Sequence, residues 1–234
     1  MLLAQLQQRL ITLADPQVAK NLQRFFKTEP GEYGAGDIFL GLKVPTLRSL
    51  AQEYQNLPLA DMVTLLKSPN HEARLLALFI LIKAFGKADP LGRTSLYQIY
   101  LNHTDYINNW DLVDASASYI VGEYLYDKER VILTQLAQSS RLWERRIAIV
   151  ATSYFIKRQQ YQDTLQIAAL LLNDREDLIH KAVGWMLREV GKQDLAVEED
   201  FLVRHYQKMP RTMLRYAIEK FSPARRELYL KGKT

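Results

Sequence analysis

A basic residue followed three positions later by a small residue recurs along this chain, and it restricts the possible folds more than any other feature. The basic residues of the four clearest copies are Arg48, Arg74, Arg145 and Lys181. With two looser copies that carry leucine instead, the small residues are Ala51, Ala77, Ala115, Ala148, Gly184 and Ala217. Their intervals are 26, 38, 33, 36 and 33 residues, and all but the first have the length of a repeat built from two helices. The pattern therefore predicts helical pairs stacked on one another.

The rest of the sequence reads almost entirely as helix. The predicted helices span residues 2–14, 16–27, 45–55, 59–67, 72–85, 90–101, 110–126, 130–138, 143–158, 162–172, 178–191, 197–208, 212–221 and 223–230. Several begin at a proline or after a polar capping residue such as Asp15 or Asn70. No region alternates with a period of two for long enough to predict a sheet, and residues 37–42 come nearest. We expect an all-α fold, a right-handed solenoid (an α–α superhelix) of about six helical pairs.

Residues 28–44, with the sequence TEPGEYGAGDIFLGLKV, are the one long irregular segment. They contain four glycines and one proline, and a loop of this length inside a helical chain is more often functional than a plain connector. The 234 residues, 48% of them hydrophobic, suit one domain over residues 1–234 that carries this glycine-rich loop. We expect the loop to lie where a ligand enters the solenoid, with Lys43 next to that ligand.

Composition excludes several kinds of chemistry. The chain has no cysteine, which excludes disulfides, thiolate metal sites and a cysteine nucleophile. The histidines lack the spacing of metal ligands and no nucleotide-binding motif is present, so we predict no metal and no cofactor; they are His71, His103, His180 and His205. No secretory signal or membrane span is predicted. We expect a cytoplasmic monomer, associated with the nucleoid if bacterial, whose net charge of +5 permits a polyanionic partner.

One repeat breaks the pattern with a carboxylate. The residues that directly precede the small residue are Leu50, Leu76, Asp114, Ile147, Val183 and Tyr216. A half-buried acid costs free energy unless it has a partner. Asp114 either is a structural acid bonded to the backbone or to Ser118, or it faces a ligand. On a helix it shares one face with Trp110, four residues earlier.

Cations and tryptophans recur near the same phase of the repeat. Residues at equal phase form a row in a solenoid, and a row of cations along the concave face is a track for phosphates. The alternative is that each cation caps a helix or bridges to the neighbouring repeat. Trp110 and Trp143 both lie five residues before the small residue, and Trp185 directly follows the fifth small residue. A lone tryptophan more often belongs to the core, whereas these three together favour a binding surface.

Four motifs carry a resemblance to a known family over nearly the whole chain. They are GEYGAGDIFLGLKVPTLR at residues 31–48, NWDLVDASA at 109–117, WERRIAI at 143–149 and KAVGWMLRE at 181–189. With them the chain resembles the DNA alkylation repair proteins of the AlkD type, which are built from HEAT-like helical repeats. The chain departs from the family glycosylases at Lys43, Phe25 and Asn109, where they carry glutamine, tyrosine and tryptophan.

The resemblance implies a DNA glycosylase that removes cationic alkylated purines, such as 3-methyladenine and 7-methylguanine, from double-stranded DNA. It places the catalytic acid at Asp114 and the two tryptophans that face the deoxyribose at Trp110 and Trp185. It places the phosphate-binding arginine at Arg146. With the cation row, the predicted DNA-binding residues are Arg146, Arg145, Lys43, Arg48, Arg74, Lys181, Arg188 and Arg215. Two alternatives stay open: a non-catalytic solenoid that binds damaged or branched DNA, and a protein-interaction scaffold.

Overall fold

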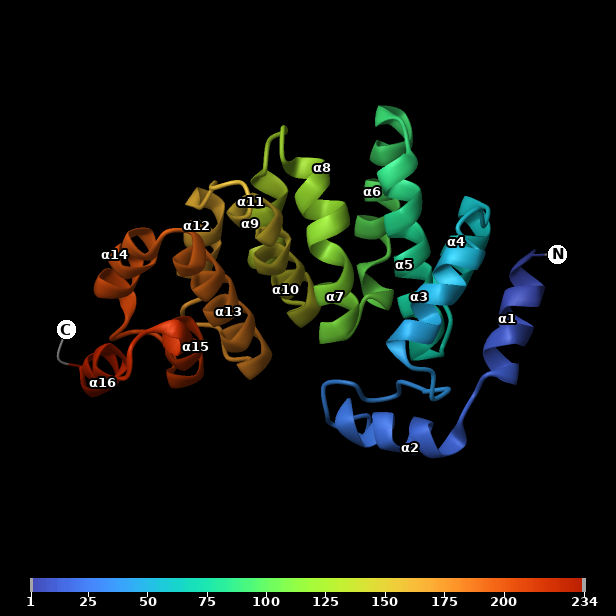
Figure 1. The fold of residues 1–234 in the computed structure, drawn as a ribbon, viewed down its shortest axis with the longest axis horizontal. Coiled ribbons are helices and arrows are strands. Elements are labelled where there is room, and N and C mark those ends of the chain that lie inside the picture. Colours follow the sequence, from blue (N-terminus) through green and yellow to red (C-terminus); the bar gives the residue numbers. More distant parts are fainter. Residues whose placement is uncertain (1, 233–234) are drawn as a thin grey trace. The chain divides into compact units, whose positions relative to one another are not determined.

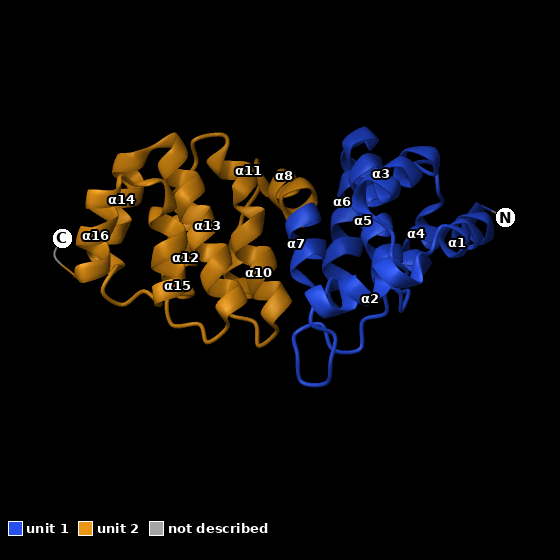
Figure 2. Cartoon of the chain, turned by 60° about the horizontal axis from the view of Figure 1, so that its bottom comes forward, with its two compact units in different colours: residues 1–116 blue, residues 117–234 orange. Residues whose placement is uncertain are grey.

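A computed structural model describes residues 2–232 and shows an all-α helical-repeat fold (Figure 1). The chain divides into two compact units, residues 1–116 and 117–234 (Figure 2). The helices that begin in the first unit are α1 (Leu2–Thr12), α2 (Pro16–Phe25), α3 (Val44–Glu53), α4 (Leu59–Leu66), α5 (His71–Lys87), α6 (Pro90–Asn102), η1 (Thr104–Tyr106) and α7 (Trp110–Ala117). Those of the second unit are η2 (Ser118–Gly122), α8 (Glu123–Leu125), α9 (Val131–Ala137), α10 (Leu142–Ala151), α11 (Ser153–Ile156), α12 (Gln162–Leu170), α13 (Asp177–Gln193), α14 (Leu195–His205), α15 (Arg211–Ala217), η3 (Ile218–Lys220) and α16 (Pro223–Lys231).

The all-α prediction is confirmed. Within residues 2–232 no β-strand forms, and the strand-like segment makes a single parallel bridge between Ile38 and Asn70. In the same residues no helix is both long enough and apolar enough to cross a bilayer. The single domain, the number of pairs and the handedness of the solenoid, and its concave face stay predictions.

Helix starts follow the capping signals only in part. The Asp15 carboxylate caps α2 as predicted, since it accepts hydrogen bonds from the backbone N–H groups of Gln17 (2.9 Å) and Val18 (3.1 Å). Asn70 occupies the capping position of α5, but its side chain makes no capping bond.

The helix predicted over residues 110–126 contains a π-helical stretch, η2, between α7 and α8. The wider π turn changes which residues share a face beyond Ala117.

The small residues of the repeat are packing positions. Ala51, Ala77, Ala148 and Ala217 are fully buried. Gly184 in α13 is buried too, and a Cβ atom there would lie 2.4 Å from the backbone oxygen of Met213 in α15. Helices α13 and α15 therefore pack backbone to backbone at this point. The exception is Ala115, which is half-buried and directly follows Asp114.

The close contact of Gly184 with α15, and the open space around Gly86, predict opposite effects of Gly→Ala substitutions on stability at these two positions. Gly184→Ala is expected to lower the free energy of unfolding by about 1–3 kcal/mol, because α13 and α15 must move apart. Gly86→Ala is the matched control: Gly86 lies on the exposed end of α5, and a Cβ atom there would meet nothing within 4 Å. It should raise stability by up to ~1 kcal/mol through helix propensity. Urea unfolding of both variants measures the difference, and equal effects would contradict the packing at Gly184.

Candidate functional site

Helix α7 carries Trp110 and Asp114 one turn apart. Its first turn is fixed by Asn109, whose side-chain oxygen accepts a hydrogen bond from the backbone N–H of Trp110 (2.8 Å) and whose carbonyl accepts one from Val113 (3.2 Å). Asp114 is half-buried. The residues at its position in four other repeats are buried and apolar: Leu50, Leu76, Ile147 and Val183. The carboxylate therefore lies at a packing position that is open to solvent in this repeat.

The charge of Asp114 acts on its surroundings. Tyr100 of α6 is fully buried, and its hydroxyl lies 2.9 Å from that of Ser116. Burial raises the pKa of Tyr100 well above its usual value, and the negative charge of Asp114 raises this pKa further. The carboxylate is thus flanked by low-dielectric protein, where its field on a developing positive charge is stronger than in water.

Aromatic rings gather at the start of α7. The Trp110 ring stacks on Phe26, with ring centroids 5.3 Å apart and planes 20° apart. Phe26 stacks in turn on Phe39 at 5.0 Å. Phe25 meets Trp110 edge-on at 6.1 Å and is 63% exposed. A large exposed aromatic side chain beside a half-buried indole is a surface on which flat or cationic groups can pack.

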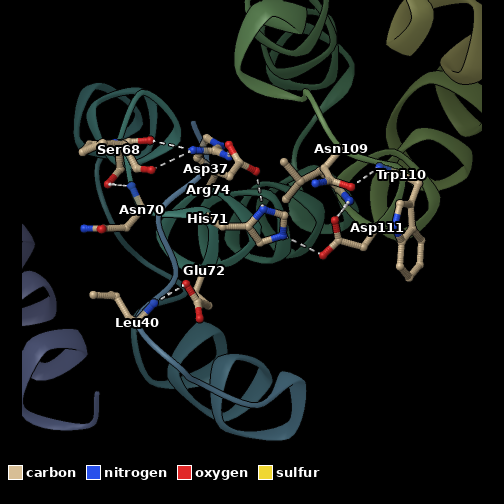
Figure 3. Close-up of polar contacts among 12 residues, drawn as sticks. Asp37, Leu40, Ser68, Asn70, His71, Glu72, Arg74, Asn109, Trp110 and Asp111 are labelled. Atoms are coloured by element: carbon tan, nitrogen blue, oxygen red, sulfur yellow. Dashed lines mark hydrogen bonds and ion pairs between the residues drawn. The ribbon is translucent and has the colours of Figure 1, made fainter. Parts of the chain in front are cut away.

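A buried polar network joins the glycine-rich loop to α5 and α7 (Figure 3). Asp37 Oδ1 accepts a hydrogen bond from Nη2 of Arg74 at 2.6 Å, and Asp37 Oδ2 lies 2.9 Å from His71 Nδ1. The other ring nitrogen, His71 Nε2, lies 2.8 Å from Asp111 Oδ2. Within residues 2–232, no group of three His, Asp or Glu side chains is arranged to hold a metal ion. No local sequence pattern marks this network, because Asp37 and Asp111 are 34 and 40 residues away from His71.

The protonated form of His71 and the ionised form of Asp37 are both stabilised by the groups that they contact. Burial alone would lower the pKa of His71, but its hydrogen bonds to Asp111 and Asp37 outweigh burial and raise this pKa above the usual 6.5. Burial alone would raise the pKa of Asp37, but the hydrogen bond from His71 and the charge of Arg74 hold this pKa below its usual 3.8.

The second half of the loop is fixed by Glu72. The buried Glu72 carboxylate accepts hydrogen bonds from the backbone N–H groups of Leu40 (2.9 Å), Gly41 (2.8 Å) and Leu42 (3.2 Å). Gly41 has φ = +87°, and a Cβ atom there would lie 2.1 Å from the carbonyl oxygen of Asp15. The loop thus returns from the end of α2 to its start (Figure 1), and an exposed lysine, residue 43, follows it directly.

Two of the predicted DNA-binding arginines have internal roles. Arg74 is 4% exposed, and besides Asp37 it donates from Nη1 to the carbonyl oxygens six and five residues earlier, at 3.1 and 3.2 Å. Arg145 donates in the same way to the carbonyls six and five residues earlier, both at 3.0 Å, and pairs with Asp174 at 2.6 Å. Each of these two arginines thus binds the carbonyl oxygens of the turn that precedes its own helix. Such contacts match the alternative stated above, in which a recurring cation caps a helix or bridges to the neighbouring repeat instead of binding phosphate. The guanidinium of Arg74 is buried in these contacts, and its part in DNA binding stays a prediction.

The other predicted cations divide into buried, paired and exposed. Arg146 is 5% exposed and donates to the carbonyl of Leu178 at 2.5 Å. Lys181 pairs with the aspartate four residues earlier (2.7 Å), and Arg188 pairs with Glu219. The exposed cations are Lys43, Arg48 and Arg215. These three side chains are open to solvent, although the guanidinium of Arg48 also lies over the ring of Phe79 at 4.5 Å.

The remaining tryptophans belong to the second unit. Trp143 in α10 and Trp185 in α13 are both half-buried. The indole N–H of Trp185 donates to Glu189 Oε1 at 3.1 Å, which fixes the plane of the ring. The structure therefore places Trp110 and Asp114 on one helix, and Trp185 in the other unit.

The sequence matches the model of a known protein family, and the fold resembles a solved structure. Residues 6–221 match the family described as DNA alkylation repair enzyme. The fold resembles a solved structure described as a predicted DNA alkylation repair enzyme from Enterococcus faecalis, with a TM-score of 0.69 at 15% identity. That similarity covers 90% of this chain and 97% of the other. A search of curated proteins finds no matching sequence.

Proposed function

The chain belongs to the DNA alkylation repair enzyme family, and from this premise we propose that it is a DNA glycosylase that hydrolyses the N-glycosidic bond of cationic alkylated purines. Family membership gives a role in DNA repair, with DNA as the substrate. The proposed lesions are 3-methyladenine and 7-methylguanine in double-stranded DNA, and the proposed catalytic carboxylate is Asp114.

The observation that carries this proposal is the half-exposed carboxylate of Asp114 at a position that four other repeats fill with buried apolar side chains. It lies one helical turn from Trp110, whose ring meets the exposed ring of Phe25. A half-exposed carboxylate one helical turn from an aromatic face fits the stabilisation of a cationic transition state.

The chemistry of the lesion explains why one carboxylate suffices. A purine alkylated at N3 or N7 already carries a positive charge. When its N-glycosidic bond breaks, the bonding electron pair stays on the base, which leaves as a neutral molecule without a general acid. Positive charge develops at C1′ of the sugar, where Asp114 stabilises it, and water then attacks C1′ and releases a proton to give an abasic site. A glycosidase acting on a neutral sugar bond needs two carboxylates instead.

The tryptophans assist this step in the proposal. An indole face beside an oxocarbenium-like sugar contributes cation–π attraction, and Trp110 is held for this by its stacking on Phe26. Trp185 is proposed as the second such ring on the strength of the family resemblance. Replacing either tryptophan with alanine should slow base release less than loss of the Asp114 charge, because each ring supplies only part of the electrostatic stabilisation.

Duplex DNA is proposed to bind through its phosphates, with the exposed Lys43, Arg48 and Arg215 among the contacts. If about 4–6 phosphates are neutralised, log K should fall with log salt concentration with a slope of roughly −4 to −5. Lys43→Ala should make this slope shallower by ~1 and weaken binding to all duplex sequences alike. Lys87→Ala is the matched control, since Lys87 is an exposed lysine outside the predicted row. Fluorescence anisotropy over a salt series measures both, and a slope near zero for the wild type would contradict phosphate binding.

The choice of lesion tests the proposed reaction. The protein should release 7-methylguanine from a duplex and leave uracil in the same sequence context, because neutral uracil lacks the charged leaving group. Salt-dependent binding without base release would place the protein in the non-catalytic DNA-binding class. Weak binding that hardly changes with salt would favour a protein-interaction scaffold.

A further inference from the structure

The buried network of Asp37, His71 and Asp111 has no part in the reaction described above. His71 is 1% exposed, at the start of α5, and both of its ring nitrogens face carboxylate oxygens, at 2.9 Å from Asp37 and 2.8 Å from Asp111. A neutral imidazole has one N–H and one lone pair. In a neutral ring, one nitrogen lone pair would therefore face a carboxylate oxygen at hydrogen-bond distance. The imidazolium form satisfies both contacts, because both of its nitrogens are donors.

Charge balance gives the same protonation state. The charged groups around the ring are the carboxylates of Asp37 and Asp111, and Arg74 behind Asp37. With neutral His71 this buried group carries one uncompensated negative charge, which is costly in the protein interior. With the imidazolium it is neutral. Phe39 stacks on the imidazole at 4.4 Å and Phe26 lies 5.0 Å away, so aromatic faces further favour a cation there.

The network reaches the proposed catalytic helix through Asp111. One oxygen of Asp111 faces His71, and the other accepts the backbone N–H of Leu112 at 2.9 Å. The first turn of α7 is thereby held to α5, and through Asp37 to the glycine-rich loop (Figure 3). Trp110 lies in this first turn, and Asp114 follows one turn later.

We propose that His71 is a positioning residue: its imidazolium bridges Asp37 and Asp111, and so fixes Trp110 and Asp114 in the geometry that base release requires. The proposal rests on the proposed function for its kinetic consequence, but not for the protonation state of His71. When His71 loses its proton, one of its two ring nitrogens can no longer donate, and the contact of that nitrogen with a carboxylate becomes repulsive. Loss of the contact with Asp111 removes the bridge between the start of α7 and α5. A displacement of a catalytic group by about 1 Å costs on the order of 10²-fold in rate.

The Asp111→Asn variant removes the negative charge of residue 111 but keeps a hydrogen bond between its side chain and His71. The asparagine amide can donate to a neutral His71 through its NH₂ group, while the other ring nitrogen donates to Asp37. This variant therefore keeps both bridges at a pH at which the wild type loses one. His71→Phe keeps the stacked ring but removes both bridges, and it serves only as the reference in which no His71 signal exists.

The first experiment reads the protonation of His71 directly, by nitrogen-15 NMR of the full chain without DNA. In the wild type, both ring nitrogens of His71 should carry protons at pH 6, with a titration midpoint above 6.5. The His71→Phe variant assigns the signals. In Asp111→Asn the midpoint should fall. A wild-type His71 that is neutral at pH 6 would overturn the proposal whether or not the protein is a glycosylase.

The second experiment compares single-turnover release of 7-methylguanine across pH. The wild-type rate should fall ~10-fold or more as the pH rises through the His71 midpoint, whereas the Asp111→Asn rate should stay level over the same range. Identical pH profiles would overturn the positioning role. If the wild type releases no base, the proposed function fails, and the pH dependence of urea unfolding takes the place of the rate. Stability that declines as the pH rises in the wild type but not in Asp111→Asn supports the bridge between His71 and Asp111. Parallel stability curves for the two proteins overturn it.

Discussion

Replacing Asp114 with asparagine is expected to slow the release of 7-methylguanine by ~10²-fold, or on the order of 3 kcal/mol of transition-state stabilisation. Asparagine keeps the shape of the side chain and its ability to accept a hydrogen bond, so the variant removes little except the charge. That charge is the proposed partner of the oxocarbenium-like sugar. Single-turnover assays with enzyme in excess measure the chemical step without product release.

Binding separates this effect from damage to the fold. Affinity of Asp114→Asn for undamaged duplex should stay the same or improve, because a negative charge near the phosphates is removed. Asp105→Asn is the matched control, since Asp105 is exposed on the short helix η1. It should leave the rate unchanged. Equal rates for wild type and Asp114→Asn would make Asp114 a structural acid, the other possibility that its position in the repeat allows.

The largest expected change in stability comes from Asp37. Asp37→Ala leaves the guanidinium of Arg74 and the imidazolium of His71 buried without their shared carboxylate. Breaking a buried charge pair by removing one partner typically costs about 3–5 kcal/mol, a large fraction of the total stability of a domain. Urea unfolding near pH 6 measures the loss. Asp127→Ala removes an exposed pair with Lys128 instead, and should cost no more than about 1 kcal/mol.

The pH dependence of stability gives an independent reading of the same network. The folded-state pKa of His71 is raised, so its stabilising contribution is complete below about pH 6.5 and is lost as the pH rises through the raised value. The pKa of Asp37 is lowered, so its contribution is present above about pH 4 and is lost as the pH falls through the lower value. Asp37→Ala should remove the acid-side loss and shrink the alkaline-side loss. An alkaline limb as steep as that of the wild type would contradict the contact between Asp37 and His71.

The sequence predicted the helical repeat well because its signal is local and periodic. A small residue every 26–38 residues predicts a packing position, and Gly184 is such a position, directly against α15. The anomalous carboxylate could be found for the same reason: Asp114 stands out only when it is compared with the equivalent residues of other repeats. Nothing in this comparison requires knowledge of contacts between distant residues.

Contacts between distant residues explain what the sequence did not reveal. The phase of Arg74 and Arg145 was predicted, but whether a cation at that phase turns outward or inward depends on the carbonyls and carboxylates that surround it in the fold. His71 has no carboxylate partner close to it in the sequence, because Asp37 and Asp111 are 34 and 40 residues away and Asp37 lies in an irregular loop without periodicity. The π-helical stretch after α7 likewise has no local sequence signal.

The most direct test of glycosylase activity is release of the free base by the wild-type protein from a duplex that contains one 7-methylguanine. The free base and the abasic strand are separated by chromatography under single-turnover conditions, with a uracil-containing duplex in parallel. We expect 7-methylguanine and abasic sites to accumulate together above the spontaneous rate, while the uracil duplex stays intact. A duplex that is bound by the protein yet keeps its 7-methylguanine at the spontaneous rate would contradict this expectation.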